Sequence, residues 1–324
     1  MRARFFEAAD AERWDDFCAR SYCATFLHAR RFLSYHGERF VDRSLILEDQ
    51  GDWVGLLPVA QRQGEPSIVG SHPGITFGGF VHKGKLRGGE MMDAFREVAA
   101  LLQTAGYSIL HYKALPYIYQ LVPAQDDLYA LFRCGANLWR RDLSSCVDLA
   151  HRLPPNPRRR RALKAADKAS VTVTVGQGRR VRELWRVVED NLERRHELAP
   201  THSFDEICLL AERFPNNIRF MVALAADEVV AGVVLFLTPR VAHAQYIGSS
   251  DRVREVHALD RLLESVIVQA AEEGRRFFDF GNSNENQGRY LNPGLIRFKN
   301  EFGSGGVTYD FFELDLRRCL NAIE

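Results

Sequence analysis

The alternation of hydrophobic and polar positions predicts the same order of elements twice along the chain. In the first half, a strand at residues 2–7 precedes a helix at 9–20, in which Trp14, Phe17 and Cys18 share one face. Further strands are predicted at 44–48, 53–59 and 107–112, with a helix at 89–104. A helix placed between two strands gives a connection long enough for a parallel crossover.

The second half repeats this order after a break in the pattern. Predicted strands cover residues 171–175, 218–225, 229–238, 240–248, 276–281 and 307–314, and predicted helices cover 181–196, 204–213, 256–273 and 294–301. The break is Pro154-Pro155-Asn156-Pro157, since consecutive prolines continue neither a helix nor a central strand. We therefore expect two tandem α/β domains with mixed sheets, at residues 1–150 and 151–324, that arose by duplication of one fold.

The composition of the 324 residues indicates a folded protein of the cytoplasm. Hydrophobic residues make up 46%, which is enough for two cores. The N-terminus lacks the apolar stretch of a signal peptide, and the longest apolar run, 229–237, is too short to span a bilayer. The six cysteines show no zinc spacing, so we expect reduced thiols and no metal site. The net charge of +1 weighs against a dedicated nucleic-acid binder.

A strand that leads directly into a helix offers a ligand two sets of main-chain donors. Residues 242–248 lead through Ser249-Ser250-Asp251 into the helix predicted from residue 256. Free strand amides and the positive end of a helix together suit a diphosphate, and Arg252 and Arg254 can add charge-assisted contacts. Any strand-to-helix turn shares these features, so a turn without a ligand is the alternative interpretation.

This arrangement resembles the GNAT superfamily of general N-acetyltransferases, whose acyl-CoA donors lay the pantetheine along such a strand and the diphosphate on the next helix. The superfamily signature has small residues where this chain has Glu255 and His257, which is a departure from the main-chain phosphate cradle. The chain more closely resembles the Fem-like tandem GNAT proteins of bacterial surface-glycan pathways. The motifs that carry this resemblance lie at residues 116–119, 123–132, 140–145, 195–196, 200–203, 214–218, 243–247, 258–260, 278–285, 291–295 and 298–303.

The resemblance implies two GNAT-like domains and an acyl-CoA-dependent N-acyltransferase, with the coenzyme A site in the second domain. Its implied acceptor is the amine of a nucleotide-linked amino sugar used in surface glycans such as lipopolysaccharide. Two alternatives share the fold: an aminoacyl-tRNA-dependent transferase acting on a peptidoglycan precursor, and a non-catalytic module that only binds ligand. The expected coenzyme contacts are Tyr246, Ile247, Gly248, Ser249, Ser250, Arg252, Arg254 and Asn282, and the expected acceptor contacts are Arg158, Arg161, Gln245, Asn284 and Lys299.

Amide formation from a thioester needs a base for the amine, donors for the tetrahedral oxyanion and a proton for the leaving thiolate. His196, His202 and Glu285 are the candidate bases, because the histidines lie near loops and Glu285 follows a predicted strand. Main-chain N–H groups near residues 247–248 are expected to hold the oxyanion, and Tyr290 to protonate the thiolate. The alternatives are structural: histidines that cap helices, a glutamate in a solvated turn and a packed tyrosine.

Basic residues concentrate at the start of the second half. Arg158-Arg159-Arg160-Arg161, with Lys164 and Lys168, falls on a helix predicted after Pro157. The run suits a polyphosphate, either a nucleotide diphosphate or the 3′-phosphate of coenzyme A. Transfer RNA suits it less well, since no exposed aromatics interleave with the arginines. A solvated helix face without a ligand is the alternative.

Overall fold

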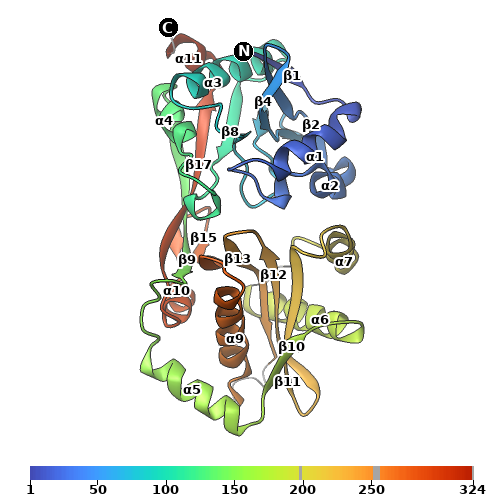
Figure 1. Cartoon of the computed structure of the whole chain (residues 1–324), viewed down its shortest axis with the longest axis vertical. Helices are drawn as coiled ribbons and strands as arrows, with labels where there is room; N and C mark the ends of the chain where they lie inside the picture. Colours follow the sequence, from blue (N-terminus) through green and yellow to red (C-terminus); the bar gives the residue numbers. More distant parts are fainter. Residues whose placement is uncertain (197–198, 251–255, 323–324) are drawn as a thin grey trace. The chain divides into compact units, whose positions relative to one another are not determined.

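The computed structural model describes residues 1–196, 199–250 and 256–322, except for the side chains of Arg195 and His196. The chain forms two compact units (Figure 1). The first comprises Met1–Asp142 with Asn286–Arg289 and Thr308–Glu324, and the second comprises Leu143–Glu285 with Tyr290–Val307. The domain bounds 1–150 and 151–324 remain a prediction, because compactness does not show that either unit folds alone.

The first unit contains two sheets with helices packed on them. Its main elements are β1 (Arg2–Phe5), α1 (Ala11–Ala19), α2 (Arg30–Leu33), β2 (Phe40–Asp42), β3 (Leu45–Asp49), β4 (Asp52–Leu57), β5 (Ala60–Arg62), β6 (Ile68–Gly70), β7 (Val81–His82), α3 (Gly89–Thr104), β8 (Ile109–Lys113), α4 (Asp126–Arg133), β17 (Gly305–Asp315) and α11 (Leu316–Ala322). One sheet has the strand order β1-β3-β4-β7, and the other runs β17-β8-β6-β5-β2 within this unit. Alternate residues of β3 supply two cores, since Leu45 and Leu47 pack with Phe95 of α3 while Ile46 packs with Trp14 of α1.

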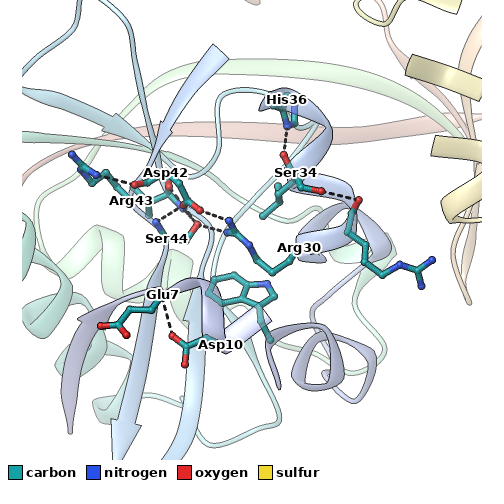
Figure 2. A network of polar contacts seen from close by, with 12 residues as sticks. Glu7, Asp10, Arg30, Ser34, His36, Asp42, Arg43 and Ser44 are labelled. Atoms are coloured by element: carbon teal, nitrogen blue, oxygen red, sulfur yellow. Dashed lines mark hydrogen bonds and ion pairs between the residues drawn. The ribbon is translucent and has the colours of Figure 1, made fainter. Parts of the chain in front are cut away.

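A network of polar contacts around Arg30 ties α2 to the strands of the first unit (Figure 2). The guanidinium forms an ion pair with Asp42 and donates to the hydroxyl of Ser44 at 3.1 Å. It also lies over the rings of Phe6 and Trp14, with its carbon 3.9 and 5.4 Å from the two ring centres. Since the charged group already has these partners, the network is structural.

The second unit is a twisted mixed sheet covered by helices. Its elements are β9 (Asn137–Asp148), α5 (Pro157–Lys168), β10 (Thr172–Val175), α6 (Arg179–His196), α7 (Phe204–Arg213), β11 (Ile218–Ala225), β12 (Glu228–Leu237), β13 (Val241–Ser249), α9 (Ala258–Glu272), β14 (Phe277–Asn282), β15 (Asn284–Glu285), β16 (Tyr290–Leu291) and α10 (Pro293–Asn300). The strand order is β10-β11-β12-β13-β14-β9 within this unit. Neighbours are antiparallel except β13 and β14, which are parallel and joined through α9.

Helices α9 and α6 lie on opposite faces of this sheet (Figure 1). The α9 face holds an apolar core that includes Leu262 and Val266 of the helix and Phe278 of β14. On the α6 face, Gly232 and Gly248 are register partners in β12 and β13. A Cβ at Gly248 would come within 2.8 Å of a main-chain carbon of α6, so these facing glycines let the helix approach the sheet closely.

The mixed α/β architecture and most of the predicted elements are confirmed. Three have the predicted bounds: α3, α7 and β11. The parallel crossover expected in the first half is present, but its first strand is β6 and not the strand predicted at 53–59. Within the described ranges, no helix has both the length and the apolar character needed to cross a membrane.

The strand predicted at 307–314 is present as β17, next to β9 in the sheet order, and one long strand was missed. Most of β17 belongs to the first unit, where Phe312 pairs with Tyr112 of β8. The missed strand is β9, whose 12 residues include Arg140, Arg141 and Asp142. The three charged residues hide the alternation of polar and apolar residues that marks a strand. The strand is recognised from its pairing with β14, which involves residues 144–148.

Candidate active site

Strands β13 and β14 separate after a short parallel contact. They pair over three register positions, the last of which is His243 with Asp279. Beyond it, β13 stays paired with β12 as far as Ser249, and β14 stays beside β9 as far as Asn282. We call this opening the fork, formed by residues 244–249 of β13 and 280–282 of β14. Its inner edge leaves main-chain donors and acceptors of β13 without a β14 partner, within the part of the chain that the structure describes.

A bulge and three buried polar atoms lie at the fork. The pairing of β12 with β13 skips Gln245, between Ala244 and Tyr246, so this residue is an extra one in the strand. The side-chain oxygens of Gln245, Ser250 and Ser283 are buried, and among the described residues none of them has a hydrogen-bond partner. Ser250 follows β13 and Ser283 follows β14. Buried polar atoms without partners are uncommon in folded proteins, and a bound ligand is one way to satisfy them.

His202 contacts Tyr246 on the β13 arm of the fork. Nδ1 of His202 lies 2.6 Å from the tyrosine hydroxyl, and the main-chain N–H of His202 donates to the same oxygen at 3.2 Å. Burial raises the pKa of Tyr246, whose ring also meets Trp185 of α6 edge-on at 5.2 Å. Ser203 caps α7 with its side chain. The sequence therefore identified the start of this helix, and the structure brings His202 to the candidate coenzyme strand.

Lys299 of α10 contacts the β14 arm of the fork. Its Nζ donates to the main-chain oxygens of Gly281 and Asn282 at 2.9 and 2.5 Å. Burial lowers the pKa of Lys299 to about 8, and the negative charge of Asp279 partly opposes that shift. A neutral amine still has two N–H donors for these two oxygens. Lys299 therefore has a fixed position and a pKa close to neutral pH.

His243 and Asp279 form a buried pair that the sequence analysis missed. Nδ1 of His243 lies 2.8 Å from Oδ2 of Asp279, whose other oxygen accepts from the hydroxyl of Ser144 and from the N–H of Gly281. Each is a polar residue with an apolar neighbour on both sides in its strand, and the two strands are joined by α9. In a parallel β-α-β unit such residues can become neighbours, and this was the available signal.

Side chains of the polar loop after β14 form hydrogen bonds to neighbouring parts of the protein. Oδ1 of Asn284 accepts from the N–H of Leu143 at 2.6 Å, which fixes the loop to β9. Glu285 and Tyr290 are register partners in the β15–β16 ribbon, and both are exposed. Oε1 of Glu285 accepts from the side chain of Asn292 at 2.8 Å. The structure therefore brings Glu285 and Tyr290 together, as a candidate base and a candidate acid on the same ribbon.

The arginine run on α5 divides into one buried and several exposed side chains. Arg159 is 5% exposed and forms ion pairs with Asp260 and Glu301. Its guanidinium lies over the rings of Phe298 and Phe302. Arg158 and Arg161 are exposed, and Arg158 lies 3.7 Å from Glu301. Because Arg159 is buried and paired, its role is structural, whereas the exposed Arg158 and Arg161 are accessible to a ligand. The sequence alone does not distinguish these arginines.

The other expected residues are placed as follows. Ile247, Gly248 and Ser249 lie on the fork segment of β13. His196 ends α6, but its side chain lies outside the described residues, as do Arg252 and Arg254.

Two surface hollows lie away from the fork. One, of about 390 Å³, is lined by β10 and the start of α6, and three strands separate β10 from β14. Its Arg180 is paired with Asp227. The other, of about 370 Å³, belongs to the first unit and adjoins Asp42 and Ser44. Arg180 in the first hollow and Asp42 in the second already have ion-pair partners, so we keep the fork as the candidate site.

Comparison with known proteins agrees with this geometry. Residues 157–299 match the family model described as an acetyltransferase (GNAT) domain. A search of curated proteins found no match. Among solved structures, a crystal structure of FemX superposes with a TM-score of 0.68 at 12% identity, covering 96% of this chain and 97% of FemX. The structure of L-PGS from Bacillus licheniformis gives 0.65 at 14% identity, covering 97% of each chain.

A third structure is described as a tandem GNAT protein from the clavulanic acid biosynthesis pathway. It superposes with a TM-score of 0.53 at 12% identity, covering 97% of this chain and 99% of that one. At such identities the likeness concerns the fold. Residues 157–299 are therefore a GNAT acetyltransferase domain, within a chain that has the tandem-GNAT, Fem-like fold.

Proposed function

We propose that the chain is an N-acyltransferase that moves an acyl group from acyl-coenzyme A to the amine of a nucleotide-linked amino sugar. The reaction would serve surface-glycan biosynthesis, such as that of lipopolysaccharide, in the cytoplasm. The observation that carries the proposal is the fork, because a GNAT domain with an opening beside its central strand can hold an extended thioester along free main-chain groups.

The residues around the fork fit the coenzyme. A pantetheine arm has amide groups that can pair with main-chain groups at residues 244–249. Ser250, whose buried side-chain oxygen has no partner among the described residues, directly follows this segment. Among the described contacts, the N-cap of α9, His257, makes no side-chain cap, so the first N–H groups of this helix suit a diphosphate. We assign the diphosphate to this helix start, with Arg252 and Arg254 as its cationic partners.

The acceptor would be held by polar and cationic side chains of the same unit. The exposed Arg158 and Arg161 suit the diphosphate of a nucleotide. Gln245, Asn284 and Lys299 would bind the sugar. His196, His202 and Glu285 remain the proposed bases from the sequence analysis, and Tyr290 the proposed acid.

Steady-state assays of the purified chain test the proposal. Acetyl-CoA and longer acyl-CoA donors are combined with a panel of nucleotide-linked amino sugars, and thiol release is measured together with the mass of the product. We expect one thiol for each amide formed with at least one pair. If no pair exceeds the uncatalysed rate, the proposal is wrong.

Direct binding measurements add a second test. Titration calorimetry with coenzyme A should show weaker binding for Ser250→Ala than for the wild-type chain. The matched control is Ser67→Ala, which changes an exposed serine just before β6 of the first unit and should bind normally.

The alternative function uses an aminoacyl-tRNA as the donor. The exposed arginines of α5 and the fold shared with FemX are compatible with this alternative. A tRNA contacts many cationic side chains, so its binding should weaken steeply as salt concentration rises. Coenzyme A carries few charges, and its binding should change far less. Transfer from a charged tRNA, with none from acyl-CoA, would select this alternative.

A further inference from the structure

His243 and Asp279 lie where the fork begins, on the face of the sheet that α6 covers. They are the last register pair of β13 and β14. The two alanines that flank His243 belong to the core under α9, and successive side chains of a strand point to opposite faces. The imidazole therefore projects from the other face, on which Tyr246 meets Trp185 of α6.

The imidazole is held in one orientation. Its Nδ1 lies 2.8 Å from Oδ2 of Asp279, a carboxylate that is fully buried. The other carboxylate oxygen accepts from the hydroxyl of Ser144 and, at 3.2 Å, from the N–H of Gly281. When Nδ1 donates its proton to Asp279, the lone pair of the neutral ring is on Nε2. Within the described residues, the hydrogen bond of this ring runs through Nδ1 alone.

Packing does not account for this pair. Lys299, a nearby cation, donates to the main-chain oxygens of Gly281 and Asn282. Apolar residues of similar volume often stabilise a core as well as a buried charged pair does. A buried carboxylate that fixes the tautomer of an imidazole is, however, the arrangement that a general base needs. The side chain of His243 keeps 10% of its surface exposed, which leaves it within reach of a ligand in the fork.

We infer that His243, in place of the bases proposed from sequence at His196, His202 and Glu285, is the proton acceptor of the acyl transfer and that Asp279 is its positioning residue, an inference that rests on the proposed function. The lone pair of the acceptor amine forms the C–N bond to the acyl carbon, and the C–S bond breaks with its electron pair going to sulfur. The proton lost by nitrogen moves to Nε2 and is returned through solvent to the thiolate. The products are an amide and a thiol, and the imidazole ends neutral.

The variant His243→Asn separates catalysis from packing. The amide nitrogen of asparagine can occupy the place of Nδ1 and keep the bond to Asp279, while the base at Nε2 is lost. We expect kcat to fall by about 10²–10⁴-fold, the usual contribution of a general base. The dissociation constant for coenzyme A and the thermal midpoint should stay unchanged. In His243→Ala, imidazole added to the solution should restore part of the turnover.

The matched control is His151→Asn. His151 is also an imidazole beside a carboxylate, 3.6 Å from Asp148, but its side chain is 76% exposed. This variant should keep the wild-type kcat. A kcat of His243→Asn equal to that of the wild type would overturn the inference. If His243→Asn binds coenzyme A poorly, the imidazole rescue decides, and its absence overturns the inference.

The same assays separate the two levels of the argument. If the wild-type chain transfers no acyl group, the proposed function fails and the role of His243 fails with it. If the wild type transfers and the variants match it, only the role of His243 fails.

Discussion

Because Gly232 and Gly248 let α6 pack closely on the sheet, we expect that replacing either of them by alanine destabilises the protein. In Gly248→Ala, the new methyl group would lie 2.8 Å from Cα and 2.9 Å from N of Val188, and 3.0 Å from the main-chain oxygen of Val187. These are backbone atoms of a helix, so no side-chain rotation relieves the contact. Non-bonded carbon atoms prefer separations of about 3.5–4.0 Å, so α6 must move away by about 0.7–1.2 Å.

That displacement should destabilise the second unit. Overpacking of a well-filled core costs about 1–3 kcal/mol, and we expect Gly248→Ala to fall in the upper half of this range because the obstacle is rigid. Gly232→Ala meets the side chain of Leu184 instead, with Cγ at 2.4 Å. A side chain has more freedom to adjust than a backbone, so the cost at Gly232 should be lower.

Urea unfolding, followed by tryptophan fluorescence, measures the effect. Trp185 of α6 lies beside Tyr246 and reports on the contact between helix and sheet. The control is Gly305→Ala in β17, where no described atom lies within 4 Å of the new methyl group. It should change the free energy of unfolding by less than about 0.5 kcal/mol. A midpoint for Gly248→Ala equal to that of the control would refute the close approach of α6 to the sheet.

The remaining predictions concern charge and pH. Arg159→Met leaves Asp260 and Glu301 without their buried cation and should cost about 3–5 kcal/mol in urea unfolding, whereas the exposed Arg158→Met should cost less than about 1 kcal/mol; equal costs would contradict the burial of Arg159. Burial lowers the pKa of His82 from 6.5 to about 4. Between pH 6.5 and pH 4 the unfolded chain binds more protons than the folded chain. The free energy of unfolding should therefore decrease by about 1.4 kcal/mol for each unit by which the pH is lowered. His82→Asn keeps an acceptor for the N–H of Gly84 and should flatten this acid-side loss in urea midpoints, and an unchanged slope would count against a buried neutral His82.

The candidate site was only partly predictable from sequence. The strand that forms one arm of the fork and the helix after it were expected from the hydrophobic pattern, and their bounds agree within a few residues. His243 and Asp279 were not expected as a pair, because they lie 36 positions apart and meet only through the register of two parallel strands. Register depends on how distant segments pack, and no local pattern encodes it.

The sequence by itself determined which segments are helices and strands, most clearly at α3, α7 and β11. Their apolar residues recur with the period of one face, which is a local property of the chain. Only the tertiary structure decided that β17 pairs with β8, that Arg159 is buried while Arg158 is exposed, and that β13 and β14 separate after His243. Each of these depends on contacts between residues far apart in sequence, which form only when the whole sheet is assembled.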